Sequence, residues 1–257
     1  MLAECAAPME FGKSFSDVAL LVTAGKLRPL GRPNPNAVMF FSLAEITIPG
    51  GVTSIGFATF EDCGISSVTI PAGVTHIGTA AFDICGGLTN VIIPDSVETI
   101  ANSAFYDCPL AAIIIRGSVT NIGSGAFSHC LGLSRVYFTG NSPIPTNDSS
   151  VFQYDSSAIA HYLPDTDGWG TTFDSIPAVP WLPEAQAIGN TFGVQSNEFG
   201  FSINWVAGQT VVVESCTNLC NPVWSPVGTN TLAASSVTFN DPQWTNYPVR
   251  FYRLRSP

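Results

Sequence analysis

The sequence predicts a mainly β protein in which a solenoid of stacked parallel coils is followed by a small antiparallel β-sandwich. Three observations predict this fold. Apolar residues recur every 22 or 23 positions, short strand-like runs recur with the same period, and the composition changes near residue 185. Only 11% of the residues are charged, while there are 23 glycines and 19 prolines, which favours short strands and turns over long surface helices.

Four columns of residues define the repeat. The clearest is a phenylalanine column with spacings of 22, 23 and 22, at Phe60, Phe82, Phe105 and Phe127. A cysteine follows each phenylalanine by three residues, at Cys63, Cys85, Cys108 and Cys130. An isoleucine precedes each by five, at Ile55, Ile77, Ile100 and Ile122. A second isoleucine column is followed by proline three times and by Arg116 once, at Ile48, Ile70, Ile93 and Ile115. Fixed offsets of this kind indicate tandem structural repeats.

One repeat predicts one triangular coil. Val91 and Ile93 alternate with outward residues as in a strand that has one buried face, and Pro94 ends the strand because it has no N–H to donate. Val97 and Ile100 form a second short inward edge, and residues 104–108 form a tight third side that we expect to be helical. One coil buries too little to fold alone, so the coils must stack.

The pattern LxxVxIPxxVxxIxxxAFxxC resembles the BspA-like leucine-rich repeat family of bacterial surface and secreted proteins. The match covers about residues 43–135 and implies a parallel-coil leucine-rich-repeat solenoid used for adhesion and protein recognition. It also implies that the full-length protein is extracellular or held at the cell surface. A degenerate coil follows around Phe152, and residues 137–181 are similar to the closing units of such arrays. In these units Trp169, Phe173 and Trp181 would cover the last coil.

We therefore expect the solenoid with its closing units over residues 43–181. Residues 1–42 show no repeat columns and are an unassigned leader, partly disordered, which leaves the first coil edge poorly covered. The leader contains no convincing signal peptide, because the apolar run 18–24 is short and follows Asp17.

Residues 185–257 are expected to form the small β-sandwich. Turn signals separate five candidate strands, at 200–206, 210–216, 223–227, 236–240 and 250–255. Gly208 and Gln209 suggest a hairpin between the first two strands, and the expected core residues are Trp205, Trp224 and Phe251. The segment from VVVESC to FYRLRSP resembles a C-terminal module of predicted secreted bacterial repeat proteins, which supports an exported setting.

Charge and hydropathy exclude some partners. The 9 basic and 19 acidic residues give a net charge of −10, which disfavours nucleic acid. The sequence has no apolar run of about 18 residues, so no membrane span is expected. The expected partner is a protein or a surface polysaccharide, and the sequence does not define an oligomeric state.

No metal site or cofactor is expected. The four periodic cysteines are spread over stacked coils, which rise about 4.8 Å each, so they cannot surround one zinc ion and are expected to be buried free thiols. Asp165-x-Asp167-Gly168 resembles only the start of a calcium loop and is expected to be a turn. Cys216 and Cys220 flank a turn, and either a disulfide or two free thiols fits their spacing.

No catalytic residues are predicted, and the chain is not expected to be an enzyme. The sequence lacks a nucleophile elbow, a metalloprotease helix motif, a phosphate loop and a dinucleotide fingerprint. His76, His129 and His161 fall at unrelated positions of the coils, with His129 in an exposed corner column. A glycan-active hydrolase would need paired carboxylates in a groove, and none is recognisable.

The remaining candidate for a binding site is the exposed face of the solenoid sheet. The outward residues at the centre of the predicted strands form one stripe, which consists of Thr47, Thr69, Ile92, Ile114 and Tyr137. The flanking row consists of Glu45, Ser67, Asn90, Ala112 and Arg135. Exposed apolar patches often mark interaction sites, so the ligand-binding candidates are Thr69, Asn90, Ile92, Ile114, Arg135 and Tyr137. The alternatives are an ordinary β-rich solvent face or a face covered by the C-terminal module. The function predicted is a non-enzymatic binding or adhesion scaffold, and the alternative is a structural envelope spacer without a specific ligand.

Overall fold

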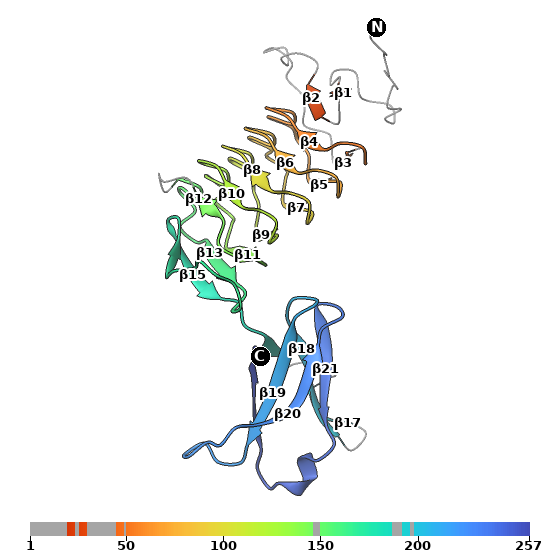
Figure 1. Cartoon of the computed structure of the whole chain (residues 1–257), viewed down its shortest axis with the longest axis vertical. Coiled ribbons are helices and arrows are strands. Elements are labelled where there is room, and N and C mark those ends of the chain that lie inside the picture. The colour runs from red at the N-terminus through yellow and green to blue at the C-terminus, as the bar shows by residue number, and fades with distance from the viewer. Residues whose placement is uncertain are drawn as a thin grey trace. The chain divides into compact units, whose positions relative to one another are not determined.

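The computed structural model describes residues 20–23, 26–29, 45–48, 50–145, 150–186, 192–195 and 198–257. The chain divides into two compact units, of which the first ends at Pro180 and the second begins at Trp181. Figure 1 shows a stack of coils in the first unit and longer antiparallel strands in the second. The mainly β fold with a parallel solenoid followed by antiparallel sheets is therefore confirmed.

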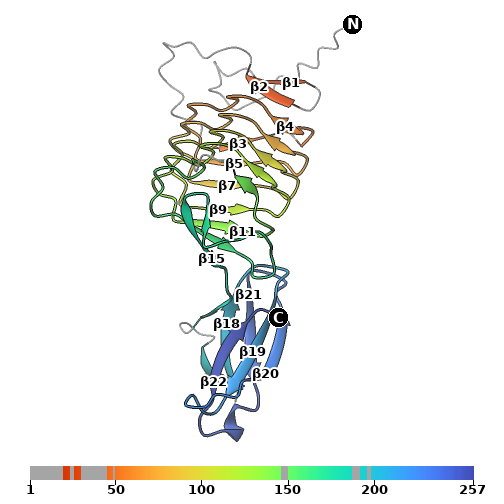
Figure 2. The same ribbon diagram turned by 60° about the vertical axis from the view of Figure 1, so that its left-hand side comes forward.

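Two rows of short, mainly parallel strands run along the solenoid. The first row is split into a three-stranded sheet of β3 (Glu45–Thr47), β5 (Ser67–Thr69) and β7 (Asn90–Ile92), and a longer sheet that contains β9 (Ala112–Ile115), β11 (Arg135–Phe138), β13 (Ile159–Tyr162), β15 (Ile176–Pro180) and β14 (Thr172–Phe173). The second row contains β4 (Ser54–Ile55), β6 (His76–Ile77), β8 (Thr99–Ile100), β10 (Asn121–Ile122) and β12 (Ile144–Pro145). Figure 2 shows the first row as a ladder of neighbouring strands.

The repeat columns point inward, as predicted. Phe60, Phe82, Phe105 and Phe127 are at most 1% exposed, and successive rings stack with centroids 5.1 to 5.4 Å apart. The isoleucines that precede them are fully buried, and parallel pairing aligns Ile55 with Ile77 and Ile77 with Ile100. Each column therefore forms one continuous line of apolar side chains along the solenoid axis.

The third side of each coil is not helical, contrary to expectation. Ala80 and Ile84, two residues before and two residues after Phe82, have left-handed backbone angles with φ of 54° and 56°. The same two positions are left-handed in the neighbouring coils. The N–H of Phe82 donates to Ala104 O at 2.8 Å, so this side bonds to the next coil. Bonds within the side, such as that from Asp83 N–H to Ala80 O at 3.2 Å, span three residues and not the four of an α-helix.

Aromatic residues close the C-terminal end of the first unit. Phe152 continues the phenylalanine stack at 5.5 Å from Phe127. Trp169 lies 4.7 Å and Phe173 5.0 Å from Phe138, ring centroid to centroid, so these two residues cover the core as predicted. The third residue of the predicted cover, Trp181, belongs to the second unit, where its carbonyl accepts a 2.9 Å hydrogen bond from Trp205 Nε1.

Two strands lie within the segment 1–42 that the sequence left unassigned. They are β1 (Leu20–Thr23) and β2 (Lys26–Pro29), which pair with each other antiparallel. Strand β2 also pairs in parallel with β4, so it continues the second row beyond the first coil. The expectation that this coil edge is poorly covered is therefore wrong along β4. The rest of the predicted leader lies outside the described residues.

The second unit consists of two antiparallel sheets. One sheet contains β16 (Glu184–Gln186), β17 (Gly193–Gln195), β18 (Glu198–Asn204) and β21 (Ser236–Asp241), and the other contains β19 (Thr210–Cys216), β20 (Ser225–Thr231) and β22 (Phe251–Arg255). A short 3-10 helix, η1 (Trp244–Asn246), precedes β22. The predicted hairpin at Gly208 is wrong, because β18 and β19 pair in different sheets and the turn joins the two.

The core of this unit differs in part from the prediction. Trp205 is 4% exposed, as expected, and packs in a core with Phe201, Ile203, Val211 and Phe239. The other two predicted core residues, Trp224 and Phe251, are half-buried. In the chain segments described above, no helix has the length and apolar character needed to cross a membrane.

Candidate binding surface of the solenoid

The predicted stripe lies on the outward face of the first row of strands. Thr69 pairs with Ile92 in one sheet, and Ile114 pairs with Tyr137 in the next. Strands β7 and β9 are neighbours (Figure 2) but belong to different hydrogen-bonded sheets, so the backbone ladder is interrupted between Ile92 and Ile114. Ile92 is 58% and Ile114 41% exposed, whereas Tyr137 is half-buried. Thr47 is the first residue of the stripe, and the backbone register pairs it with Thr69.

The stripe is longer than predicted. His161 pairs with Tyr137, and their rings lie 5.1 Å apart. Val179, which is 38% exposed, pairs with His161 in the last parallel strand. The outward position of His161 is less evident from the sequence because the degenerate coil is longer than the preceding ones, with Phe152 25 residues after Phe127. The outward position could have been found by aligning residues 159–162 with 135–138.

The flanking row lies where it was expected. Asn90 and Arg135 are exposed, and Arg135 pairs with Ala112 on one side and Ile159 on the other. Ile159 is 37% exposed and extends the apolar surface next to the stripe. All six predicted candidates, Thr69, Asn90, Ile92, Ile114, Arg135 and Tyr137, therefore lie on one face of the solenoid. They form a shallow strip of mixed apolar and polar character.

The four periodic cysteines are buried free thiols that line the core. Cys85 Sγ donates to Phe60 O at 3.0 Å, and Cys130 Sγ makes the same bond to Phe105 O at 3.1 Å. Burial raises the pKa of Cys63 and of Cys130 to about 12, and hydrogen bonding with Cys85 raises the pKa of Cys108. Protonated thiols of this kind are poor metal ligands and poor nucleophiles, and their role is to pack and to satisfy backbone carbonyls.

A carboxylic acid takes the place of the next cysteine. Asp155 follows Phe152 by three residues, as each cysteine follows its phenylalanine, and it is 3% exposed. Neither carboxyl oxygen has a hydrogen-bond partner. Burial raises the pKa of Asp155 to about 7, while the nearby backbone amide of Cys130 opposes the shift without bonding either oxygen. The column therefore ends in a neutral carboxyl at mildly acidic pH.

The other candidate motifs carry no site chemistry. Asp167 O accepts a 2.9 Å hydrogen bond from Ser142 N–H, and Asn141 Oδ1 accepts one of the same length from Asp167 N–H. The segment from Asp165 to Gly168, with φ of 85° at Gly168, is thus a hydrogen-bonded turn. Cys216 is buried and Cys220 exposed, and the two are not bonded to each other. Within the described residues, no group of three or more His, Cys, Asp or Glu side chains is placed to hold a metal ion.

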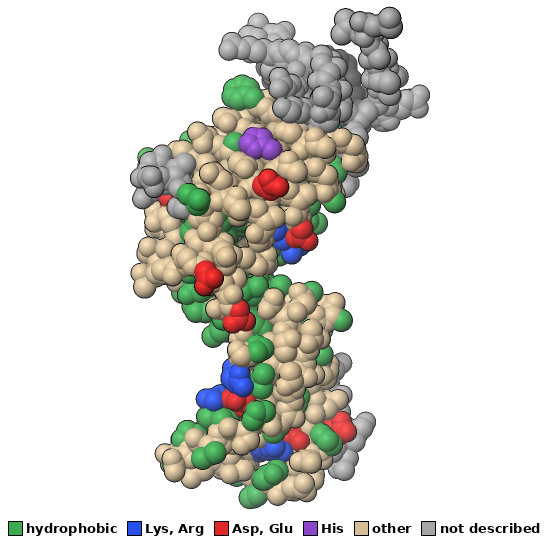
Figure 3. Space-filling model, in the orientation of Figure 1, with side chains coloured by type: hydrophobic (Ala, Val, Ile, Leu, Met, Phe, Trp, Pro, Cys, Tyr) green, Lys and Arg blue, Asp and Glu red, His purple; other side chains and the backbone are tan. Residues whose placement is uncertain are grey.

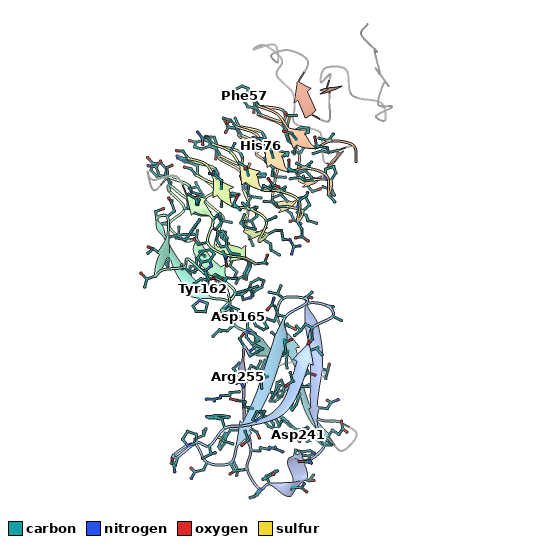
Figure 4. All side chains as sticks on the ribbon, viewed as in Figure 1. Phe57, His76, Tyr162, Asp165, Asp241 and Arg255 are labelled. Carbon is teal, nitrogen blue, oxygen red and sulfur yellow. The ribbon has the colours of Figure 1, made fainter. Side chains whose placement is uncertain are left out.

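The remaining two histidines lie on different parts of the surface. His76 is exposed on β6 in the second row, where Figure 4 labels it. His129 is half-buried and lies between the rings of Tyr106 and Tyr154, with centroids 5.0 and 4.3 Å away. The predicted exposed corner is therefore a small aromatic cluster, and neither histidine faces a nucleophile or a paired carboxylate in these contacts.

Comparison with known proteins gives one family match. A family model described as "BspA type Leucine rich repeat region (6 copies)" matches residues 35–160, so it begins before the predicted start of the repeats at residue 43. No curated protein matches the sequence.

Several solved structures are similar to the chain. One is a leucine-rich cell surface protein of Faecalibacterium prausnitzii A2-165, with 23% identity and a TM-score of 0.47, covering 62% of this chain and 40% of that one. A leucine-rich repeat protein of T. pallidum has 23% identity and a TM-score of 0.46, covering 58% of this chain and 70% of that one. A leucine-rich repeat protein of Bacteroides ovatus ATCC 8483 has 23% identity and a TM-score of 0.39, covering 59% and 47%. The chain thus spans less than half the length of the first and third of these proteins.

Proposed function

The repeat region of this chain belongs to the BspA-type leucine-rich repeat family, and on that premise we propose that the protein is a non-enzymatic binding or adhesion scaffold at the bacterial cell surface or exterior. The solenoid recognises another protein through the outward face of its first row of strands. Thr69, Asn90, Ile92, Ile114, Arg135 and Tyr137 contribute to the contact, and His161 and Val179 extend it.

The observation that carries the proposal is the exposure of large apolar side chains in consecutive coils. Ile92 and Ile114 present 58% and 41% of their surface, next to the ring of Tyr137. A solenoid core does not need these side chains, because inward residues alone fill it. Exposed aliphatic and aromatic side chains aligned on a rigid sheet are typical of protein interaction surfaces. Arg135 at the edge adds one cation on a chain whose net charge is −10, which favours a partner with a carboxylate at that position.

The test is a pull-down from bacterial envelope extract with the double variant Ile92→Asp, Tyr137→Ser. Both changed residues point outward, so we expect the far-UV circular dichroism and the unfolding midpoint to stay close to wild type. The variant should no longer capture the partner protein, because two contacts that are buried in the complex would be replaced by a desolvated carboxylate and a small hydroxyl. The matched control is His76→Asp, Asn121→Ser, which changes two outward residues of the second row and should leave capture unchanged.

The alternatives give different results. Capture that is unchanged in the Ile92→Asp, Tyr137→Ser variant would remove this face as the binding surface. Capture that survives protease treatment of the extract would identify a surface polysaccharide as the partner. A wild-type chain that captures nothing would favour a structural spacer of the envelope, whose solenoid needs no specific ligand.

A further inference from the structure

An open pocket lies in the second unit and is lined by strands of both of its sheets. Its volume is about 490 Å³, within the range of roughly 300–1,000 Å³ that is common for ligand pockets. One wall is formed by Arg250–Leu254, which include most of β22. The lining also includes Phe199 and Phe201 of β18, Ala185 of β16 and Phe192, which precedes β17. The walls are therefore mainly aromatic and aliphatic.

The polar side chains in the pocket already have partners. Tyr252 Oη donates to Asp241 Oδ2 at 2.7 Å, and Arg250 Nη1 lies 2.7 Å from the same oxygen. Asp241 is 4% exposed, so this neutral cluster is part of the interior. Phe192, in contrast, is 47% exposed in the lining. A group that enters the pocket therefore meets mainly aromatic and aliphatic surface, which selects an apolar side chain, while Arg253 in the lining lies outside this neutral cluster.

A free strand edge runs along the pocket. Among the residues that the structure describes, β22 pairs only with β19, and it is an edge strand of the sheet β20-β19-β22. The outer N–H and C=O groups of Phe251–Arg255 are thus available to another strand. Edge strands of this kind bind extended peptides by adding one strand to the sheet, while alternate side chains of the peptide enter pockets beside the edge. The combination of edge and pocket fits a polypeptide better than a compact small molecule.

The charge on β22 selects among peptides. Glu214 accepts hydrogen bonds from Arg253 Nε at 2.8 Å and from Arg255 Nε at 2.9 Å, so two arginines share one carboxylate. These bonds, led by the one from Arg255, lower the pKa of Glu214, which stays ionised. One positive charge is left over, and the side chains of Arg253 and Arg255 are 48% and 44% exposed.

The figures show the same association of charge and apolar surface. In Figure 3, basic side chains of the second unit gather with hydrophobic ones on the face in view. Figure 4 labels Arg255 and Asp241 at separate places in the unit. The Arg250–Asp241 pair and the Arg253–Arg255–Glu214 group are therefore separate along β22, and only the second carries excess positive charge.

We propose that the edge of β22 and the pocket beside it bind an extended acidic peptide of a partner protein. The peptide adds a strand to β22, inserts one large apolar side chain into the pocket against Phe192, and sets carboxylates near Arg253 and Arg255. Alternation along a strand permits both, because Tyr252 faces inward to Phe201 while Arg253 and Arg255 face the other side. This site is distinct from the surface of the solenoid, and neither proposal depends on the other.

The experiment measures binding of the fluorescein-labelled peptide TVEFEVT to the full chain by fluorescence anisotropy. Valine and phenylalanine lie on one face of this peptide and glutamate on the other. We expect saturable binding that weakens with added salt. The Phe192→Glu variant should bind at least about tenfold more weakly, which corresponds to about 1.4 kcal/mol. The matched control is Val223→Glu, an exposed valine outside the pocket, which should bind as wild type does.

Three further measurements separate the parts of the proposal. The peptide TVKFKVT should bind more weakly than TVEFEVT, and the Arg255→Gln variant should bind TVEFEVT with less dependence on salt, since Arg253 and Glu214 then form a neutral pair. A peptide with N-methylated main-chain amides should not bind, because it cannot pair with the strand edge. The proposal is overturned if wild type shows no saturable binding, if both charge versions bind equally, if the methylated peptide binds, or if folded Phe192→Glu retains full affinity.

Discussion

The rings of Phe82 and Phe105 stack with their centroids 5.1 Å apart and their planes 3° from parallel. Both side chains are fully buried, and the stack continues with similar spacing from Phe60 to Phe152. Each ring therefore packs against the coil below and the coil above. A change in one ring affects the contacts of three coils, and the stack is where the solenoid should be most sensitive to substitution.

Phe105→Ala should destabilise the solenoid by about 3–5 kcal/mol, the cost usual for removing a buried aromatic side chain and leaving a cavity. Denaturant unfolding followed by far-UV circular dichroism measures it. Phe105→Leu should cost less, because it fills much of the space. Ile92→Ala, at an exposed position, serves as the control. If Phe105→Ala lowers the free energy of unfolding no more than this control does, the continuous stack is contradicted.

Ile84→Asn should stabilise the chain. Ile84 has φ of 56°, a left-handed conformation that costs a β-branched residue on the order of 1–2 kcal/mol, and its side chain is 45% exposed, so little packing is lost. Asparagine tolerates this conformation, and aspartate occupies the equivalent position at Asp62 and Asp107. Thermal unfolding should show a higher midpoint. Thr69→Asn, at an exposed strand position, should show no gain; an equal gain there would mean that the backbone angle is not the cause.

The buried thiols should resist alkylation while Cys220 reacts. Cys220 is exposed, whereas the four column cysteines are at most 6% exposed, and burial raises the pKa of Cys63 and Cys130 to about 12. Only the thiolate reacts with iodoacetamide, so at pH 8 these two thiols carry almost none of the reactive form. Mass spectrometry of tryptic peptides after a short exposure should find the label on Cys220, and labelling of the column only after denaturation. Rapid labelling of Cys130 in the folded chain would contradict its place in the core.

The sequence predicts the solenoid because inward residues repeat at fixed offsets. Phe82 and Ile77 can be assigned to the core from their columns alone, since stacking requires the same inward position in every coil. The third side was not predictable in the same way. Ala80 and Ile84 adopt left-handed angles without being glycine, because bonding to the next coil imposes them, and no local residue preference reports that constraint.

The second unit and the candidate surface were likewise predictable only in part. Gly208 correctly signals a turn, but a turn residue does not tell whether the next strand joins the same sheet, and here it joins the other. On the surface, Ile92 and Tyr137 were found because they lie between inward residues of regular coils. His161 was missed because the longer coil shifts its position along the sequence, although the register pairs it with Tyr137. The pocket beside β22 arises from residues distant in sequence, which no local pattern brings together.

The last prediction concerns the buried carboxyl that ends the cysteine column. The pKa of Asp155 is raised from 3.8 to about 7, mainly by burial. In the unfolded chain the carboxyl ionises near the ordinary value, so the folded state binds the proton more tightly. Its contribution to stability is therefore fully present below about pH 4 and is lost as the pH rises through about 7.

Asp155→Asn keeps the size of the side chain and removes the titration, and Asp155→Cys restores the residue of the other coils. Relative to wild type, both variants should gain stability as the pH rises from about 4 to about 7, and the gain should level off above that, since only wild type has to bury a carboxyl that ionises in this range. Burial also raises the pKa of Asp83 and Asp174, so the difference between each variant and wild type, measured by thermal unfolding across this range, isolates the effect of Asp155. Thr69→Asn changes an exposed side chain that does not ionise and should show a constant difference. If the stability difference between Asp155→Asn and wild type is also constant with pH, the carboxyl of Asp155 does not titrate in this range. The assignment of a buried, protonated carboxyl at the end of the cysteine column would then be wrong.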